Sequence, residues 1–268
     1  MERKIGFIGA GNIGSAMIKA LVKSGFVKAS NIYAVNNNHS EKLLQLQAET
    51  GISICANNTE LADKSDVIVV AVKPQSVKSV TEEIKSVFGE KLLITIAAGI
   101  PVKVFENILG NRSRIFRAMP NLPLLVGEGM TIITYNAGME AADIKYVKTL
   151  FERFGKVEVM DESLLSTVIS LTASSPAYVF MLLEAMASSV IKIGLPVNLA
   201  YEISAQSILG SAKMCLKEQE NQDFFTHEPD WNMELLDTSV VFNADKIKSA
   251  LAEAIAACNK KAWEFEKI

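Results

Sequence analysis

The sequence has few of the residues that build metal sites, disulfide frameworks or histidine-based catalysis. Its three cysteines, Cys55, Cys215 and Cys258, lie far apart and form no Cys-x-x-Cys pair. This spacing argues against a disulfide scaffold and a zinc motif, so we expect no bound metal and a reducing, cytoplasmic environment. The two histidines, His39 and His227, lie in polar stretches, where we expect them to be solvated.

Excess charge and long uninterrupted apolar runs are also scarce. The net charge is −3 and no group of Lys and Arg forms a basic stripe, which argues against nucleic acid or an anionic membrane as a partner. The most apolar stretch, residues 176–199, contains Glu184, Lys192 and a Gly-Leu-Pro break. We therefore expect a buried helix there and not a membrane span. Because the chain opens directly with a strand pattern, we also expect no signal peptide.

The most informative stretch is at the N-terminus. An apolar run over residues 5–8 leads into Gly9-Ala10-Gly11-Asn12-Ile13-Gly14, and helical spacing follows. In this strand–turn–helix context Gly9 makes the tight turn, Gly11 lets the backbone approach a pyrophosphate, and Gly14 lets the helix pack on the strand. The first N–H groups of the helix and its dipole favour a phosphate. The pattern predicts a dinucleotide-binding site.

The end of the second expected strand, residues 31–35, bears on the choice of cofactor. Sites for NAD usually carry Asp or Glu here, about 20 residues after the glycines. Residues 36–40 instead read Asn-Asn-Asn-His-Ser, with no carboxylate before Glu41. A 2′-phosphate would meet no repulsion beside Asn36 and Ser40, so we predict NADP, with NAD as the alternative. A polar loop in which Ser40 caps the next helix would explain the same residues.

The rest of the chain predicts two domains. Apolar runs at residues 67–72, 92–96, 115–118, 130–134 and 156–159 indicate further strands, and with the first two they predict a Rossmann-type doubly wound α/β sheet over residues 1–160. From Asp161 onward only helical spacing occurs, so residues 161–268 are expected to form an all-α domain. The helix beginning at Pro176 is apolar on nearly every face, which predicts burial in a bundle or between subunits. We therefore expect a homodimer, with room for a higher oligomer.

Together these stretches resemble the pyrroline-5-carboxylate reductase family over nearly the whole chain. The resemblance implies a Rossmann domain followed by a helical domain that intertwines with a second subunit. It also implies hydride transfer from NAD(P)H to the C=N carbon of a small cyclic imine, 1-pyrroline-5-carboxylate, giving proline. The matching motifs, in chain order, are Gly9-Ala10-Gly11-Asn12, Ala71-Val72-Lys73-Pro74-Gln75, Ala97-Ala98-Gly99, Arg117-Ala118-Met119-Pro120-Asn121, Val126-Gly127-Glu128-Gly129 and Ser174-Ser175-Pro176-Ala177-Tyr178.

The resemblance implies a role for particular residues and assigns no catalytic residue. The pyrophosphate would be held by Ile8, Gly9, Ala10, Gly11, Asn12 and Ile13. The adenosine and ribose side would be lined by Asn58, Ala71, Val72, Lys73 and Pro74, and the nicotinamide would be seated by Ala97, Ala98, Gly99, Met119, Pro120 and Asn121. The substrate-binding candidates are Ser174, Glu220 and Asn232.

Two departures from the family pattern keep other functions open. The segment before Pro176 lacks both family glycines, and residues 230–235 lack the Gly-Gly-Thr-Thr element that grips the substrate carboxylate. The alternatives are a reductase of another cyclic imine and a dinucleotide-binding regulatory homologue without catalysis. A 3-hydroxyacid dehydrogenase fits less well, because it would want a lysine between Asp161 and Ile191, where there is none.

Overall fold

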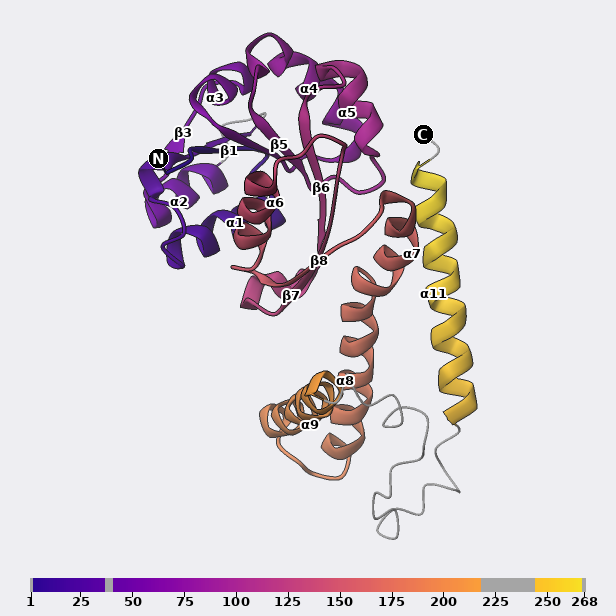
Figure 1. Cartoon of the computed structure of the whole chain (residues 1–268). Coiled ribbons are helices and arrows are strands. Elements are labelled where there is room, and N and C mark those ends of the chain that lie inside the picture. The colour runs from indigo at the N-terminus through magenta and orange to yellow at the C-terminus, as the bar shows by residue number, and fades with distance from the viewer. Residues whose placement is uncertain (1, 37–40, 218–243, 267–268) are drawn as a thin grey trace. The chain divides into compact units, whose positions relative to one another are not determined.

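The computed structural model describes residues 2–36, 41–217 and 244–266. Within these ranges an eight-stranded sheet has the order β3-β2-β1-β4-β5-β6-β7-β8 (Figure 1). Neighbouring strands are parallel except β6 and β7, which are antiparallel. The strands are β1 (Ile5–Ile8), β2 (Ile32–Val35), β3 (Ser53–Ile54), β4 (Val67–Val70), β5 (Leu92–Thr95), β6 (Arg114–Pro120), β7 (Gly129–Tyr135) and β8 (Gly155–Val159). The expected doubly wound α/β sheet is confirmed.

The central strands β1, β4 and β5 are buried on both faces, since successive side chains point to opposite sides of the sheet and both sides are covered. Val67 and Val69 belong to one hydrophobic core, whereas Ile68 and Val70 belong to the other. The first core also takes side chains from α1 (Asn12–Lys23), α2 (Glu41–Thr50) and α6 (Ala141–Phe151). The second takes them from α3 (Asn58–Lys64), α4 (Pro74–Phe88) and α5 (Val102–Leu109). Short 3₁₀ helices occupy Ala29–Asn31 and Leu122–Val126.

The described residues form two compact units, one made of residues 1–173 with 257–268 and the other of residues 174–256. Helix α7 (Glu162–Thr172) lies in the first unit, where Leu165 packs with Met119 and Ile132. The purely helical part of the chain begins after β8, next to the expected change at Asp161. The division into domains 1–160 and 161–268 remains a prediction, since packing groups α7 with the sheet.

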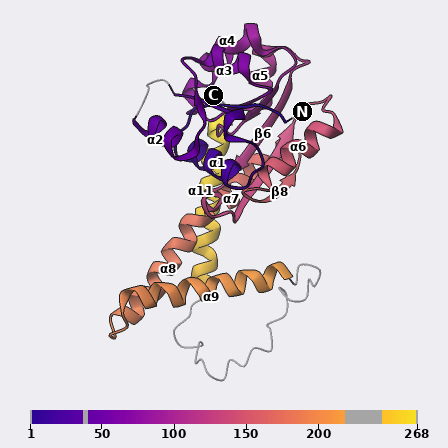
Figure 2. The same ribbon diagram turned by 90° about the vertical axis from the view of Figure 1, so that its left-hand side faces the viewer.

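The second unit contains α8 (Ser175–Ile191) packed against α9 (Val197–Lys217) (Figure 2). The turn between them contains Gly194, which has a φ of 105°. Glycine adopts this backbone conformation readily, whereas other residues are strained in it. Pro196 follows that turn, so α8 ends where the sequence pattern predicts. The last described helix is α11 (Ala244–Glu266).

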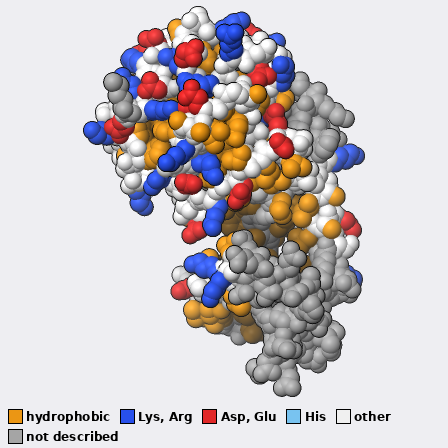
Figure 3. Space-filling view, viewed as in Figure 1, with side chains coloured by type: hydrophobic (Ala, Val, Ile, Leu, Met, Phe, Trp, Pro, Cys, Tyr) orange, Lys and Arg blue, Asp and Glu red, His pale blue; other side chains and the backbone are white. Residues whose placement is uncertain are grey.

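In the described part of the chain, most of helix α8 is exposed or only partly buried, contrary to one of the two expectations for it. Phe180 and Met181 are 56% and 60% exposed, and Figure 3 shows hydrophobic side chains at the surface of the helix pair. By length and composition alone, the described stretch Glu162–Ile191 could cross a membrane, and only 17% of its most apolar window is buried. The same properties are typical of a helix that pairs with another protein chain.

Candidate functional site

The predicted cofactor residues converge at one edge of the sheet. In the parallel pairs, Ile8 is level with Val35 and Val70, and Val70 is level with Thr95. The carboxyl ends of β1, β2, β4 and β5 therefore meet, and β6 ends at the same edge. Strand order reverses direction between β1 and β4, at the crevice where doubly wound sheets bind dinucleotides.

The glycine turn is shaped for close approach of a ligand. Gly9 has φ of 97°, and a Cβ there would lie 2.6 Å from the Ala71 carbonyl oxygen. A Cβ on Gly14 would lie 2.4 Å from the carbonyl oxygen of Gly9, so α1 packs directly on the turn. A Cβ on Gly11 would meet nothing within 4 Å. Gly11 is also the N-cap of α1 and has no side chain to cap it, so the space in front of the first helical N–H groups is open to an anion.

Asn36 directly follows β2 and is bonded to the glycine turn. Its Oδ1 accepts a hydrogen bond of 3.0 Å from the backbone N–H of Ala10. The Gly9 N–H is bonded to the Val35 carbonyl at 2.9 Å. The predicted pyrophosphate residues and this predicted ribose-side residue are thus brought together. Ser40, the other predicted residue of this loop, lies outside the described residues.

A cavity of about 340 Å³ opens beside this turn. Its lining residues are Ala10, Gly11, Asn12, Ser15, Lys19, Asn36, Lys42, Gln45, Leu46 and Glu49. Lys19 pairs with Glu49 at 2.5 Å, and its hydrogen bond holds the pKa of Glu49 below the ordinary value. Lys42 forms no ion pair with a described residue, so its ammonium group is the lining cation available to an anionic ligand.

Sequence reasoning missed the two lysines of this cavity, although helical spacing carries the signal. Ser15 and Lys19 are four residues apart on α1, and Lys42, Gln45 and Glu49 recur at intervals of three and four on α2. Such spacing places each set on one helix face. The two faces are combined into one cavity only by the packing of α1 beside α2, which the sequence pattern does not specify.

The residues predicted for the adenosine and ribose side follow β4 or begin α3. Ala71 comes directly after β4, and its N–H is bonded to the Ile8 carbonyl at 2.8 Å. Lys73 is the N-cap of α4 and Pro74 its first residue. Asn58 begins α3 and is buried, and its Nδ2 donates to Glu83 of α4 at 2.8 Å. The Asn58 side chain therefore also joins two helices.

The residues predicted for the nicotinamide side lie at the ends of β5 and β6. Ala97 is buried and Ala98 exposed in the turn after β5, where Gly99 has φ of 73°. Met119 and Pro120 end β6. Both ends of the Asn121 side-chain amide are bonded within the fold, because Oδ1 accepts from the Met130 N–H at 2.8 Å and Nδ2 donates to the Thr172 carbonyl at 3.0 Å.

The predicted substrate residues are described only in part. Ser174 precedes α8 as its N-cap and makes no side-chain cap hydrogen bond. Glu220 and Asn232 lie outside the described residues, as do both histidines and the segment 230–235. Among the described residues, no group of three or more His, Cys, Asp or Glu side chains could hold a metal ion.

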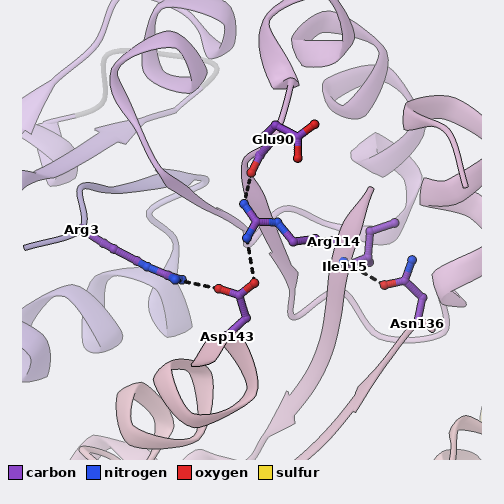
Figure 4. A network of polar contacts seen from close by, with 6 residues as sticks. All are labelled: Arg3, Glu90, Arg114, Ile115, Asn136 and Asp143. Carbon is purple, nitrogen blue, oxygen red and sulfur yellow. Dashed lines mark hydrogen bonds and ion pairs between the residues drawn. The ribbon is translucent and has the colours of Figure 1, made fainter. Parts of the chain in front are cut away.

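A second polar cluster lies at the opposite, amino edge of the sheet (Figure 4). Asp143 of α6 is 1% exposed and pairs with Arg3 at 2.6 Å and with Arg114 at 2.7 Å. Arg114 also donates to the carbonyl oxygen of Glu90. None of these residues is a predicted site residue, and the bonds connect the start of β1, the start of β6 and α6. The cluster stabilises the sheet.

Comparison with known proteins finds two family models that match separate parts of the chain. Residues 4–99 match the family described as "NADP oxidoreductase coenzyme F420-dependent", and residues 162–228 match "Pyrroline-5-carboxylate reductase dimerisation". A pyrroline-5-carboxylate reductase of Escherichia coli is 36% identical over 272 residues, covering 100% of both chains. A solved pyrroline-5-carboxylate reductase structure from Coxiella burnetii superposes with a TM-score of 0.86 at 29% identity, covering 100% of both chains. The structure of a Plasmodium falciparum pyrroline carboxylate reductase with NADP bound superposes with a TM-score of 0.81 at 27% identity, covering 98% of each chain.

Proposed function

The chain belongs to the pyrroline-5-carboxylate reductase family, and from this premise we propose that it reduces 1-pyrroline-5-carboxylate to proline with a nicotinamide dinucleotide. It is an oxidoreductase acting on a C=N bond. The observation that carries the proposal is the identity of 36% over the full length of the Escherichia coli enzyme. The open space at Gly11 and the uncapped start of α1 fit the pyrophosphate that such a cofactor brings.

The cavity beside the glycine turn supports NADP over NAD. Val35, the last residue of β2, and Asn36 after it carry no carboxylate, so no carboxylate there accepts a hydrogen bond from a ribose 2′-hydroxyl in the way usual for NAD. Lys42 lines the same cavity without an ion pair to a described residue, and an ammonium group favours a 2′-phosphate. Replacing Lys42 by Gln should weaken NADPH binding about three- to tenfold and leave NADH binding unchanged. The exposed Lys85→Gln on α4 is the matched control.

The reaction needs the two reactants to be held in a near-attack arrangement. The bound cofactor supplies a hydride, which adds to the C=N carbon of the protonated ring. The turn at Ala97–Gly99 and the end of β6 at Met119–Asn121 are the proposed seat of the nicotinamide, and the small side chains of that turn allow close approach. Ser174 is the described candidate for a hydroxyl donor to the substrate. Positioning of this kind accounts for rate acceleration without a histidine base.

The helical part of the chain is the proposed dimerisation and substrate domain. The dimerisation family match covers residues 162–228, and α8 exposes Phe180 and Met181. A second copy of the chain would cover this surface, giving a homodimer that can assemble further. The enzyme is proposed to work in the cytoplasm as a step of proline biosynthesis.

An assay of NADPH oxidation with 1-pyrroline-5-carboxylate and a panel of other cyclic imines tests the activity. The expected result is turnover of 1-pyrroline-5-carboxylate above the rest of the panel. Because residues 230–235 lack Gly-Gly-Thr-Thr, we expect a KM higher than that of the Escherichia coli enzyme measured alongside. Faster turnover of another imine would show that this imine, and not 1-pyrroline-5-carboxylate, is the substrate. NADPH binding without any turnover would favour the regulatory alternative.

A further inference from the structure

Glu162, the first residue of α7, bonds two elements at the nicotinamide end of the sheet. One carboxylate oxygen, Oε1, accepts from the backbone N–H of Val102 at 2.9 Å and from Nη1 of Arg117 at 2.9 Å. Val102 begins α5, and Arg117 lies in the middle of β6. Sequence reasoning did not single out Glu162, since nothing nearby in the sequence connects it to either partner.

The bond to Val102 caps α5 from outside the helix. The N-cap of α5 is Pro101, which makes no side-chain cap hydrogen bond, so the first N–H of the helix needs an acceptor from elsewhere. A carboxylate at this position also interacts favourably with the positive end of the helix dipole. Because only Ile100 and Pro101 separate the turn Ala97–Gly99 from α5, the bond anchors the chain just after that turn.

The bond to Arg117 holds the other side of the proposed nicotinamide seat. Arg117 is 0% exposed, and a buried guanidinium requires a charged or polar partner. In the sheet Arg117 is level with Thr95, the last residue of β5, and stands two residues before Met119. Glu162 therefore connects the start of α5, which follows the turn after β5, to the middle of β6 through one oxygen atom.

The far end of α7 is bonded to the same region. The carbonyl oxygen of Thr172, the last residue of α7, accepts from Nδ2 of Asn121 at 3.0 Å. Between these two ends, Leu165 packs on Met119 and Ile132. Helix α7 is thus attached at its start to α5 and β6, along its length to β6 and β7, and at its end to the turn after β6.

We propose that Glu162 is a positioning residue for hydride transfer, which sets the spacing between the Ala97–Gly99 turn and the Met119–Asn121 segment and so the pose of the nicotinamide ring. The proposal rests on the proposed function for its kinetic part. The part of the proposal that concerns binding does not depend on the reaction. It compares how tightly the protein holds the nicotinamide half and the adenosine half of the cofactor.

The test compares Glu162→Ala with Glu162→Gln, which keeps the acceptor oxygen. Calorimetry measures the binding of NADPH and of 2′,5′-ADP, which carries the 2′-phosphate and no nicotinamide. For Glu162→Ala we expect NADPH affinity to fall about tenfold, 2′,5′-ADP affinity to stay within about twofold, and kcat to fall roughly ten- to a hundredfold. The deuterium isotope effect on kcat with 4-deuterated NADPH should rise, because misplacement slows the hydride step. Glu162→Gln should recover most of the NADPH affinity and of kcat.

Asp143→Asn is the control, since it disrupts a carboxylate–arginine pair at the opposite edge of the sheet, in which one partner is again almost fully buried. It should lower Tm while NADPH affinity and the isotope effect stay unchanged. If Glu162→Ala and Glu162→Gln lower only Tm, or weaken both ligands equally, Glu162 is structural and the proposal is overturned. If Glu162→Ala does not fold, Glu162→Asp, whose carboxylate is one methylene shorter, replaces it, and the ratio of its NADPH and 2′,5′-ADP affinities decides. If the wild type binds NADPH and reduces no imine, the proposed function fails and the affinity ratio still tests the positioning role.

Discussion

The backbone N–H of Ala10 donates a hydrogen bond of 3.0 Å to Oδ1 of Asn36. The glycine turn after β1 is therefore bonded to the side chain of the residue that follows β2. The glycine turn and Asn36 both line the cavity that Lys42 also lines, so a ligand in that cavity would contact the turn and Asn36 together. The shape of the turn and the proposed selection of the cofactor thus involve the same side chain.

The first prediction concerns Asn36→Asp. One Asp oxygen can still accept from Ala10, while the other offers an acceptor to a 2′-hydroxyl and repels a 2′-phosphate. We expect the ratio of NADPH to NADH affinity to fall by roughly tenfold. Calorimetry with both cofactors measures it, and the exposed Asn107→Asp on α5 controls for the added charge. An unchanged ratio would show that the 2′ position lies elsewhere.

The second prediction contrasts two glycines of the same turn. Gly11→Val should reduce dinucleotide affinity at least about tenfold, because the side chain fills the space left for the pyrophosphate, with a stability loss of only about 1 kcal/mol for the poorer N-cap. Gly14→Ala should instead destabilise the fold by about 1–3 kcal/mol, since its Cβ meets the Gly9 carbonyl oxygen. Calorimetry and thermal unfolding of both variants separate the two effects. Normal NADPH affinity in Gly11→Val would contradict the proposed pyrophosphate site.

The third prediction concerns the surface of α8. Met181→Glu places a charge where the proposed second copy would bind, so the protein should become monomeric or aggregate. Leu44→Glu on α2 is the control, because Leu44 is similarly exposed, at 52%, on the sheet unit. Light scattering at low micromolar concentration measures the assembly. A wild type that is already a monodisperse monomer would rule out the dimer.

The fourth prediction concerns alkaline stability. Burial raises the pKa of Tyr146 to about 12 from an ordinary value near 10. The unfolded chain therefore releases this proton first, so the stability from the neutral phenol is complete below pH 10 and lost as the pH rises towards 12. Tyr146→Phe should lose less stability than wild type between pH 8 and pH 11, by about 1–2 kcal/mol. Urea unfolding at both pH values tests this, with the exposed Tyr201→Phe as control; equal losses would place the Tyr146 phenol in contact with water.

Sequence patterns predicted the elements whose local signals are strong. The β-branched run that begins at Val67 is strand β4, and the Gly-Leu-Pro break at Gly194 separates α8 from α9. The two-residue strand β3 has no pattern long enough to detect. The family resemblance is confirmed, while the roles of the individual cofactor residues remain predictions.

The parts of the site that sequence did not predict depend on tertiary packing. Lys19 and Lys42 share a cavity because α1 and α2 lie side by side. Arg117 and Glu162 are 45 positions apart, and only the docking of α7 onto β6 brings them into contact. The exposure of α8 could not be predicted from the sequence either. Periodicity shows that a helix is apolar, but it does not show which part of the protein or which partner covers it.

The contact of Arg3 with Asp143 spans 140 positions of the chain. During synthesis on the ribosome, the first strand is made long before the helix that supplies its buried counter-charge. Until residue 143 has left the exit tunnel, the arginine at the start of β1 lacks that partner, and the amino edge of the sheet stays incomplete. Long-range closure of this kind slows folding relative to local contacts. Truncated chains that stop before α6 should therefore be captured by chaperones and proteases more readily than chains that stop after it.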